Sequence, residues 1–220
     1  MGLGLALVAF IIVVTLLGFM VVQAMFAARK WRAVIKAGDR GALLQLLDMT
    51  LEDWRNSRPP KGTPPADWRA LHTAQLVAAD RDRARVSLLA DADVRVIEGR
   101  REEVASAYVV ARRSAVRMVE RLLYEVPHTH FLEVQVDVNS EYRTADGDTE
   151  ARCLLTVRVP REVAALSDWE EGTPDELLAE WQVQDGETGQ TPEPDRDPLI
   201  GATELQAVDE AETTLREAGG

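Results

Sequence analysis

Apolar residues gather first at the N-terminus, where the run from Leu3 to Val22 contains no charged residue. A helix of about 20 apolar residues rises about 30 Å, the thickness of the hydrocarbon core of a bilayer. A cleaved signal peptide is the alternative, but it needs a positive start and a shorter apolar core, and this run has neither. The pattern therefore predicts an uncleaved transmembrane anchor within residues 1–28.

Basic residues follow this run within 15 residues of its end. They are Arg29, Lys30, Arg32 and Lys36. Because basic residues beside a membrane helix favour the cytoplasmic side, we expect them to set the orientation. The prediction is a single-pass protein of the cell membrane with its N-terminus outside, residues 29–220 in the cytoplasm and the lipid bilayer as a partner.

The next pattern has the period of an amphipathic helix. Leucines at 43, 44, 47 and 51, followed by Trp54, recur at three- and four-residue spacing, and Asp39 can cap the helix that they predict over residues 40–57. Residues 29–58 are therefore predicted to be juxtamembrane amphipathic helices. Four prolines then make residues 59–65 a linker, since proline removes a backbone donor and fixes φ.

Residues 66–182 mix helical and strand periods, which predicts an α+β cytoplasmic domain. For residues 80–100 the spacing favours a helix to about Ala92 and then a short strand at Val94–Val96, although the two periods compete throughout this stretch. Arg101–Glu125 predicts a longer helix with an apolar face running from Val104 to Leu122. Its opposite face carries four arginines, which we expect to be solvated with glutamates as partners: Arg112, Arg113, Arg117 and Arg121.

A hairpin is the best-defined element. Strict alternation over Phe131–Val138 puts Leu132, Val134, Val136 and Val138 on one face, as in a half-buried strand, and Cys153–Val159 predicts the antiparallel partner. Thr173 and Glu176 match a capping box that opens a short helix. The predicted fold class is α+β: an N-terminal transmembrane helix, cytoplasmic helices packed with a small antiparallel hairpin or sheet, and a disordered acidic tail.

Charge separates the tail from the rest. The chain has 37 acidic and 25 basic residues, and almost half of the acidic ones follow residue 165. Low hydrophobicity predicts that residues 183–220 are largely disordered. Within this tail, three apolar residues at helical spacing are candidates for docking a partner: Leu205, Val208 and Leu215. A near-neutral body with an acidic tail gives no reason to expect nucleic-acid binding.

Candidate chemistry is sparse. His128 and His130, with Asp137, are the best metal-ligand candidates, but only two of the three are adjacent in sequence, and the pattern favours loop histidines over a metal site. The single cysteine, Cys153, cannot form an intramolecular disulfide. No nucleophile elbow, phosphate loop or dinucleotide fingerprint occurs, so we predict neither catalytic residues nor a cofactor.

These features predict a membrane-anchored interaction or assembly protein that binds a protein partner or forms a homo-oligomer. Its apolar faces at residues 43–54 and 104–122 can pack within one chain or between copies. Two alternatives remain at this stage. One is a membrane-tethered, metal-dependent hydrolase or nuclease that uses His128, His130 and Asp137, and the other is an accessory subunit of a larger membrane complex.

Overall fold

The computed structural model of the chain describes residues 10, 14–23, 25–26, 29, 39–143, 146–189 and 191–201. Helices and strands alternate irregularly, as in an α+β fold. Their bounds are α2 (Arg40–Asn56), α3 (Pro65–His72), β1 (Gln75–Ala79), β2 (Arg83–Leu89), β3 (Asp93–Ile97), β4 (Arg100–Ala105), α4 (Ala107–Glu120), the π-helical turn η1 (Arg121–Glu125), β5 (Glu133–Arg143), β6 (Thr149–Pro160), α5 (Arg161–Ala164), α6 (Pro174–Ala179), β7 (Gln182–Asp185) and the 3₁₀ turn η2 (Gly186–Thr188).

The predicted transmembrane anchor is wrong. Among the described residues, no helix is long and apolar enough to cross a membrane. This finding overturns the predicted single-pass location in the cell membrane and its orientation, whereas the predicted partners, the lipid bilayer included, stay predictions. Of the orientation residues, Arg29 is described and exposed; Lys30, Arg32 and Lys36 lie outside the described residues.

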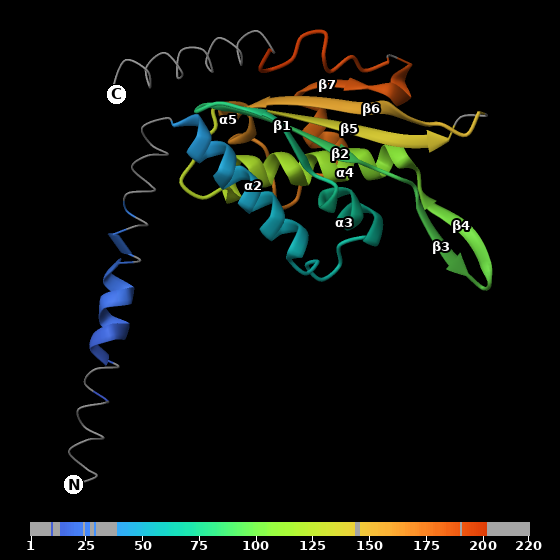
Figure 1. The fold of residues 1–220 in the computed structure, drawn as a ribbon. Helices are drawn as coiled ribbons and strands as arrows, with labels where there is room; N and C mark the ends of the chain where they lie inside the picture. The colour runs from blue at the N-terminus through green and yellow to red at the C-terminus, as the bar shows by residue number, and fades with distance from the viewer. Residues whose placement is uncertain are drawn as a thin grey trace.

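Five strands form one mixed sheet in the order β1-β2-β5-β6-β7. Strands β2 and β5 are parallel, and every other neighbouring pair is antiparallel. In Figure 1 the helices α2, α3 and α4 lie along one face of this sheet, and the segment that follows β7 crosses the opposite face. The sheet is therefore the middle layer of the molecule.

The core lies between the sheet and the helices. The predicted hairpin is confirmed: Val134, Val136 and Val138 of β5 face β6 in register and are fully buried, whereas Leu132 precedes the strand and is exposed. Helix α2 confirms the helix expected at 40–57, and Asp39 Oδ1 accepts the Ala42 N–H at 2.8 Å. Its leucines belong to the same core as the sheet, so α2 is part of the domain.

Residues 83–105 correct the sequence prediction. The expected helix to Ala92 is strand β2, and the first residues of the expected helix 101–125 are strand β4, because Ser106 caps α4 only after that point. Strand β2 lies between β1 and β5, and these tertiary pairings override a local helical spacing. The short strand expected at Val94–Val96 is confirmed within β3.

The predicted disorder of the acidic tail is wrong for its first part. Residues 183–185 complete β7, and residues 191–201, which we call the strap, lie on the outer face of the sheet. Pro192, Leu199 and Ile200 of the strap are buried. These apolar residues are few, but the strap also gains polar contacts that an isolated chain lacks. The expected docking residues Leu205, Val208 and Leu215 lie outside the described residues.

Candidate functional site

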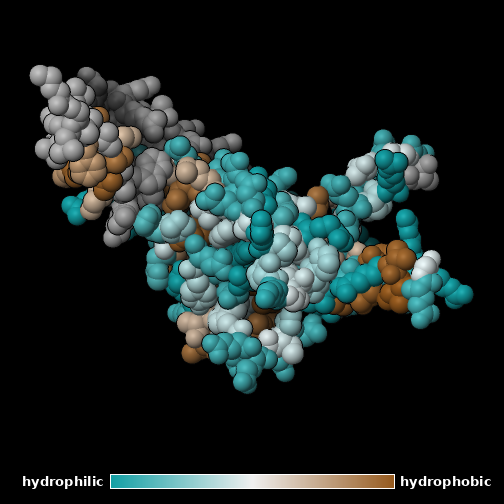
Figure 2. Space-filling view, turned by 90° about the horizontal axis from the view of Figure 1, so that it is seen from below, coloured by the Kyte–Doolittle hydropathy of each residue, from teal (hydrophilic) through white to brown (hydrophobic). Residues whose placement is uncertain are grey.

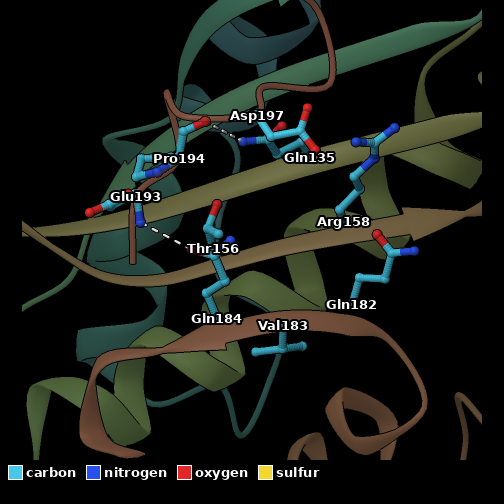
Figure 3. Close-up of a pocket in the computed structure, with 9 residues that line it drawn as sticks. All are labelled: Gln135, Thr156, Arg158, Gln182, Val183, Gln184, Glu193, Pro194 and Asp197. Carbon is cyan, nitrogen blue, oxygen red and sulfur yellow. Dashed lines mark hydrogen bonds between the residues drawn. The ribbon is translucent and has the colours of Figure 1, made fainter. Parts of the chain in front are cut away.

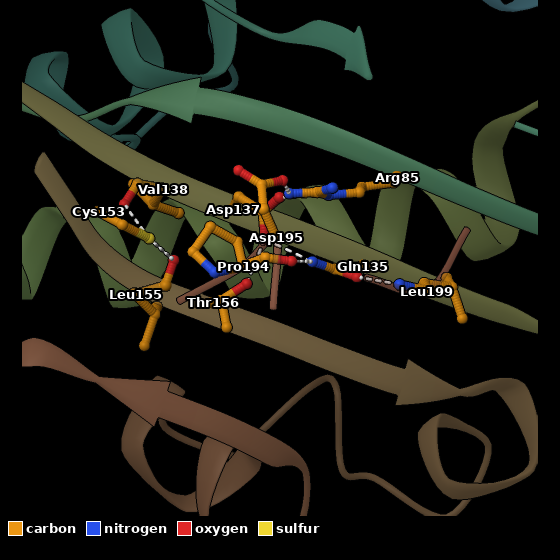
Figure 4. Close-up of polar contacts among 10 residues, drawn as sticks. All are labelled: Arg85, Gln135, Asp137, Val138, Cys153, Leu155, Thr156, Pro194, Asp195 and Leu199. Carbon is orange, nitrogen blue, oxygen red and sulfur yellow. Dashed lines mark hydrogen bonds and ion pairs between the residues drawn. The ribbon is translucent and has the colours of Figure 1, made fainter. Parts of the chain in front are cut away.

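The outer face of the sheet carries a buried polar network at its centre. Alternation along the strands turns Arg85 of β2, Gln135 and Asp137 of β5 and Thr156 of β6 away from the apolar core. The Arg85 Nε donates to Asp137 Oδ2 at 2.6 Å, and the Gln135 Nε2 donates to Asp137 Oδ1 at 2.8 Å. The Thr156 hydroxyl also donates to Asp137. Figure 4 shows these side chains converging on one carboxylate.

The strap covers this network with a second carboxylate. Asp195 Oδ1 lies 2.8 Å from Arg85 Nη2, so one guanidinium faces two carboxylates. Burial by itself lowers the pKa of Arg85, but the attraction of Asp137 and the contacts with Asp195 outweigh it and raise that pKa above its ordinary value. Arg85 is therefore a permanent buried cation, and it can hold anionic groups.

A polar hollow of about 240 Å³ lies beside the network, between the strap and β5, β6 and β7. Figure 3 shows its walls, which are mostly amide, hydroxyl and charged side chains. They are Gln135, Thr156, Arg158, Gln182, Val183, Gln184, Glu193, Pro194 and Asp197. Such walls can hydrogen-bond a polar group or a peptide backbone.

Cys153 does not add a nucleophile to this face. Burial raises the pKa of its thiol to about 12, so the thiol is protonated at neutral pH. The thiol lies 3.7 Å from the Val138 carbonyl oxygen and 3.6 Å from the Leu155 carbonyl oxygen. These contacts give Cys153 a packing role.

The proposed metal ligands do not converge. His128 and His130 are exposed in the loop before β5, whereas Asp137 is buried within the strand and bonded to Arg85. In the ranges that the structure describes, no group of three or more histidine, cysteine, aspartate or glutamate side chains is placed to hold a metal ion. The sequence identified Asp137 as a candidate, but the structure gives it an ion-pair partner on another strand.

The arginines of the helix α4 region have acidic partners, as expected, but not all of them lie on a solvated face. Arg121, in η1, is buried between two indole rings, 5.2 Å from the centroid of Trp54 and 5.3 Å from that of Trp68. This burial lowers the pKa of Arg121. The expected glutamate partners are present for Arg117, which contacts Glu120 and Glu125, and for Arg121, whose Nε lies 3.6 Å from Glu125 Oε2. Arg112 pairs with Asp185, Glu187 and Asp175, and Arg113 pairs with Asp67.

A second feature stands apart from the sheet. Strands β3 and β4 form a two-stranded ribbon, which we call the arm, and Figure 1 shows it projecting from the body. Its apolar side chains are 43–70% exposed. Figure 2 shows them as a brown, hydrophobic patch on the projecting arm. They are Val94, Val96, Ile97 and Val104. The arm was not predicted, because the helical spacing from Val104 onward placed residues 101–105 in a helix.

Comparisons with protein-family models, curated proteins and solved structures found no match to this chain. The outer face of the sheet and the arm are therefore the two features from which a function can be argued.

Proposed function

We propose that this chain is a protein-assembly module that binds a second copy of itself through the arm. The observation that carries this proposal is the exposure of the arm's valine and isoleucine side chains on a ribbon that projects from the body. Clustered apolar side chains on a projection are typical of protein–protein interaction sites. The docking role expected for Leu205, Val208 and Leu215 remains a separate prediction.

The arm lacks the support that a ribbon normally needs. Within the described part of the chain, β3 and β4 hydrogen-bond as a sheet only with each other. A two-stranded ribbon alone is marginally stable in water, whereas three or more strands with an apolar face are stable. Pairing with another copy supplies those strands and covers unpaired backbone groups at the edge.

Strand β4 is complementary to itself when two copies pair antiparallel about Glu102. Arg101 then lies opposite Glu103 of the second copy, twice by symmetry, and Arg100 covers Val104 of the second copy with its aliphatic stem. The two Glu102 side chains meet at the axis, where each also has Arg95 opposite it on its own β3. The charges therefore favour a second copy as the occupant of this edge.

The register between β3 and β4 allows the pairing of β4 between two copies to be tested. Arg101 and Glu103 lie opposite Val96 and Val94 of their own chain, so reversing their charges leaves the pairing inside one arm almost unchanged. The experiment measures the monomer–dimer equilibrium of the full chain by sedimentation velocity over a range of concentrations. We expect R101E and E103R each to weaken association at least about tenfold, because two attractive pairs become repulsive.

The double variant R101E/E103R is the decisive sample. It restores both attractive pairs, so we expect association close to that of the unmodified chain. R81E is the matched control, because it makes the same charge change at an exposed turn between β1 and β2. Association that is insensitive to R101E, or that the double variant fails to restore, contradicts pairing through β4.

A further inference from the structure

We infer that the outer face of the sheet is a recognition surface for an extended acidic peptide of another protein, and that the chain's own strap occupies this surface as an internal competitor. The strap, residues 191–201, is the only occupant present in the described part of the chain. Its contacts define what the surface recognises; Figure 3 shows those of Glu193 and Pro194, and Figure 4 shows those of Asp195 and Leu199.

Side chains of the sheet hold the backbone of the strap. Gln184 Oε1 accepts the Glu193 N–H at 3.0 Å, and Gln135 Oε1 accepts the Leu199 N–H at 2.7 Å. The Arg83 Nη1 donates to the Leu199 carbonyl oxygen at 2.8 Å. Contacts of side chains with a backbone do not depend on the sequence of the bound segment, so they suit a peptide receptor.

Two further contacts set a sequence preference. Arg85 is buried and pairs with Asp195 of the strap, and Ala78 of β1 packs with Leu199 and Ile200. An aspartate followed four residues later by leucine therefore meets both a cation and an apolar patch. The predicted partner is an extended segment with this spacing and an overall acidic character.

The strap is attached in a way that allows release. It adds no strand to the sheet, its apolar anchor is a cluster separate from the main core, and the hollow of about 240 Å³ remains beneath it. Elements with few buried apolar contacts open at a lower free energy than the core. Release also leaves Arg85 paired with Asp137, so no buried charge is left without a partner.

The test uses a fluorescein-labelled peptide of residues 191–201 and the full chain in two forms. One form is unmodified, and the other carries D195N/L199A, which weakens the strap but leaves the receptor face intact. Binding is measured by fluorescence anisotropy. We expect the weakened-strap form to bind the peptide at least tenfold more tightly than the unmodified chain, because the internal competitor is lost.

Matched variants on one strand test the backbone contacts. Gln184 and Gln182 are both exposed on β7 and both line the hollow, but only Gln184 bonds the strap. In the weakened-strap form we expect Q184A to reduce peptide affinity severalfold and Q182A to leave it unchanged. A labelled peptide carrying D195N should bind up to about fivefold more weakly than the native peptide, because the Asp195 side chain is 86% exposed in its pair with Arg85.

Equal peptide binding by the unmodified and weakened-strap forms overturns the inference. If D195N/L199A fails to fold, amide hydrogen exchange of the unmodified chain tests whether the strap opens separately from the rest of the domain. The Leu199 amide, bonded to Gln135, should exchange at least tenfold faster than the Val136 amide of the buried strand β5. Equal protection of the two amides would mean that the strap opens only when the whole domain unfolds, and it would overturn the inference.

Discussion

Arg85 is the buried cation of the outer sheet face, and it forms two ion pairs. Its guanidinium contacts two carboxylates that differ in burial: the side chain of Asp137 is 3% exposed, and that of Asp195 is 86% exposed. A buried ion pair loses several kcal/mol when one partner is removed, whereas an exposed partner contributes about 1 kcal/mol or less. The two aspartates therefore have different roles despite their similar distances.

The free energy of unfolding should separate these roles. We expect D137N to lower it by about 3 kcal/mol, because Arg85 then lacks its buried counter-charge. D195N should lower it by less than about 1 kcal/mol, because Asp195 is mostly solvated. Urea denaturation of both variants checks this, and equal losses would show that Asp137 has no special share in stability.

Cys153 makes a second prediction at this scale. With the thiol pKa raised to about 12 from an ordinary 9.0, the thiolate fraction at pH 8 is about a thousandfold lower in the folded chain than in the unfolded chain. We expect reaction with a disulfide reagent to be at least about 100-fold slower in buffer than in denaturant. Glutathione, measured in both solvents, corrects for solvent effects on the reagent.

The same shift predicts a dependence of stability on pH. Between about pH 9 and pH 12 the unfolded chain loses the thiol proton while the folded chain keeps it, so the free energy of unfolding falls as the pH rises through this window. C153S should lack this part of the slope. Identical slopes for C153S and the unmodified chain would mean that the thiol pKa is the same in both states.

Among the helices and strands, features set by residues close together in the chain, such as helix caps, were predicted correctly. The capping box of Thr173 and Glu176 is present, and so is the Asp39 cap of α2. Strand β4 was missed because Val104 fits the helical spacing of the apolar face that runs on to Leu122, and only the pairing with β3 makes residues 100–105 a strand. Strand β2 was missed for the same reason, since its neighbours β1 and β5 include a distant segment.

Substitutions in the turn between β3 and β4 should change the stability of the arm. Glu98 and Gly99 have φ angles of 50° and 80°, the left-handed pair that a two-residue hairpin turn requires and that Asn-Gly satisfies best. We expect E98N to stabilise the arm by about 0.5 kcal/mol and G99A to destabilise it by about 1 kcal/mol. Amide exchange at Val96, measured at a concentration where the chain is monomeric, should be slower in E98N and faster in G99A.

At the scale of the whole molecule, the sheet has two covered faces with different kinds of contact. Helices α2, α3 and α4 bury one face with apolar side chains, and the strap covers the other mainly through polar contacts. Two leucines with almost equal exposure belong to different sides: Leu88 to the main core, at 1%, and Leu199 to the small cluster under the strap, at 2%.

These leucines give a matched test of how the molecule unfolds. We expect L88A to lower the global free energy of unfolding by about 2–5 kcal/mol, as in other buried cores. L199A should lower it by less than about 1 kcal/mol, because a strap that opens first adds little to global stability. Urea denaturation checks both, and equal losses would place the strap inside the main cooperative unit.

Features that depend on residues close together in the chain could be predicted from the sequence: the amphipathic helix α2, the β5–β6 hairpin, the helix caps and the sharp change of charge in the tail. The remaining features depend on contacts between segments that are distant in the chain. Alternation along β5 reveals a polar face, but Arg85 and the strap, distant in sequence, decide that this face is buried and paired. A charge or an apolar residue acquires its role from what packs against it, and for Asp137, Arg121 and the strap those neighbours lie on other elements.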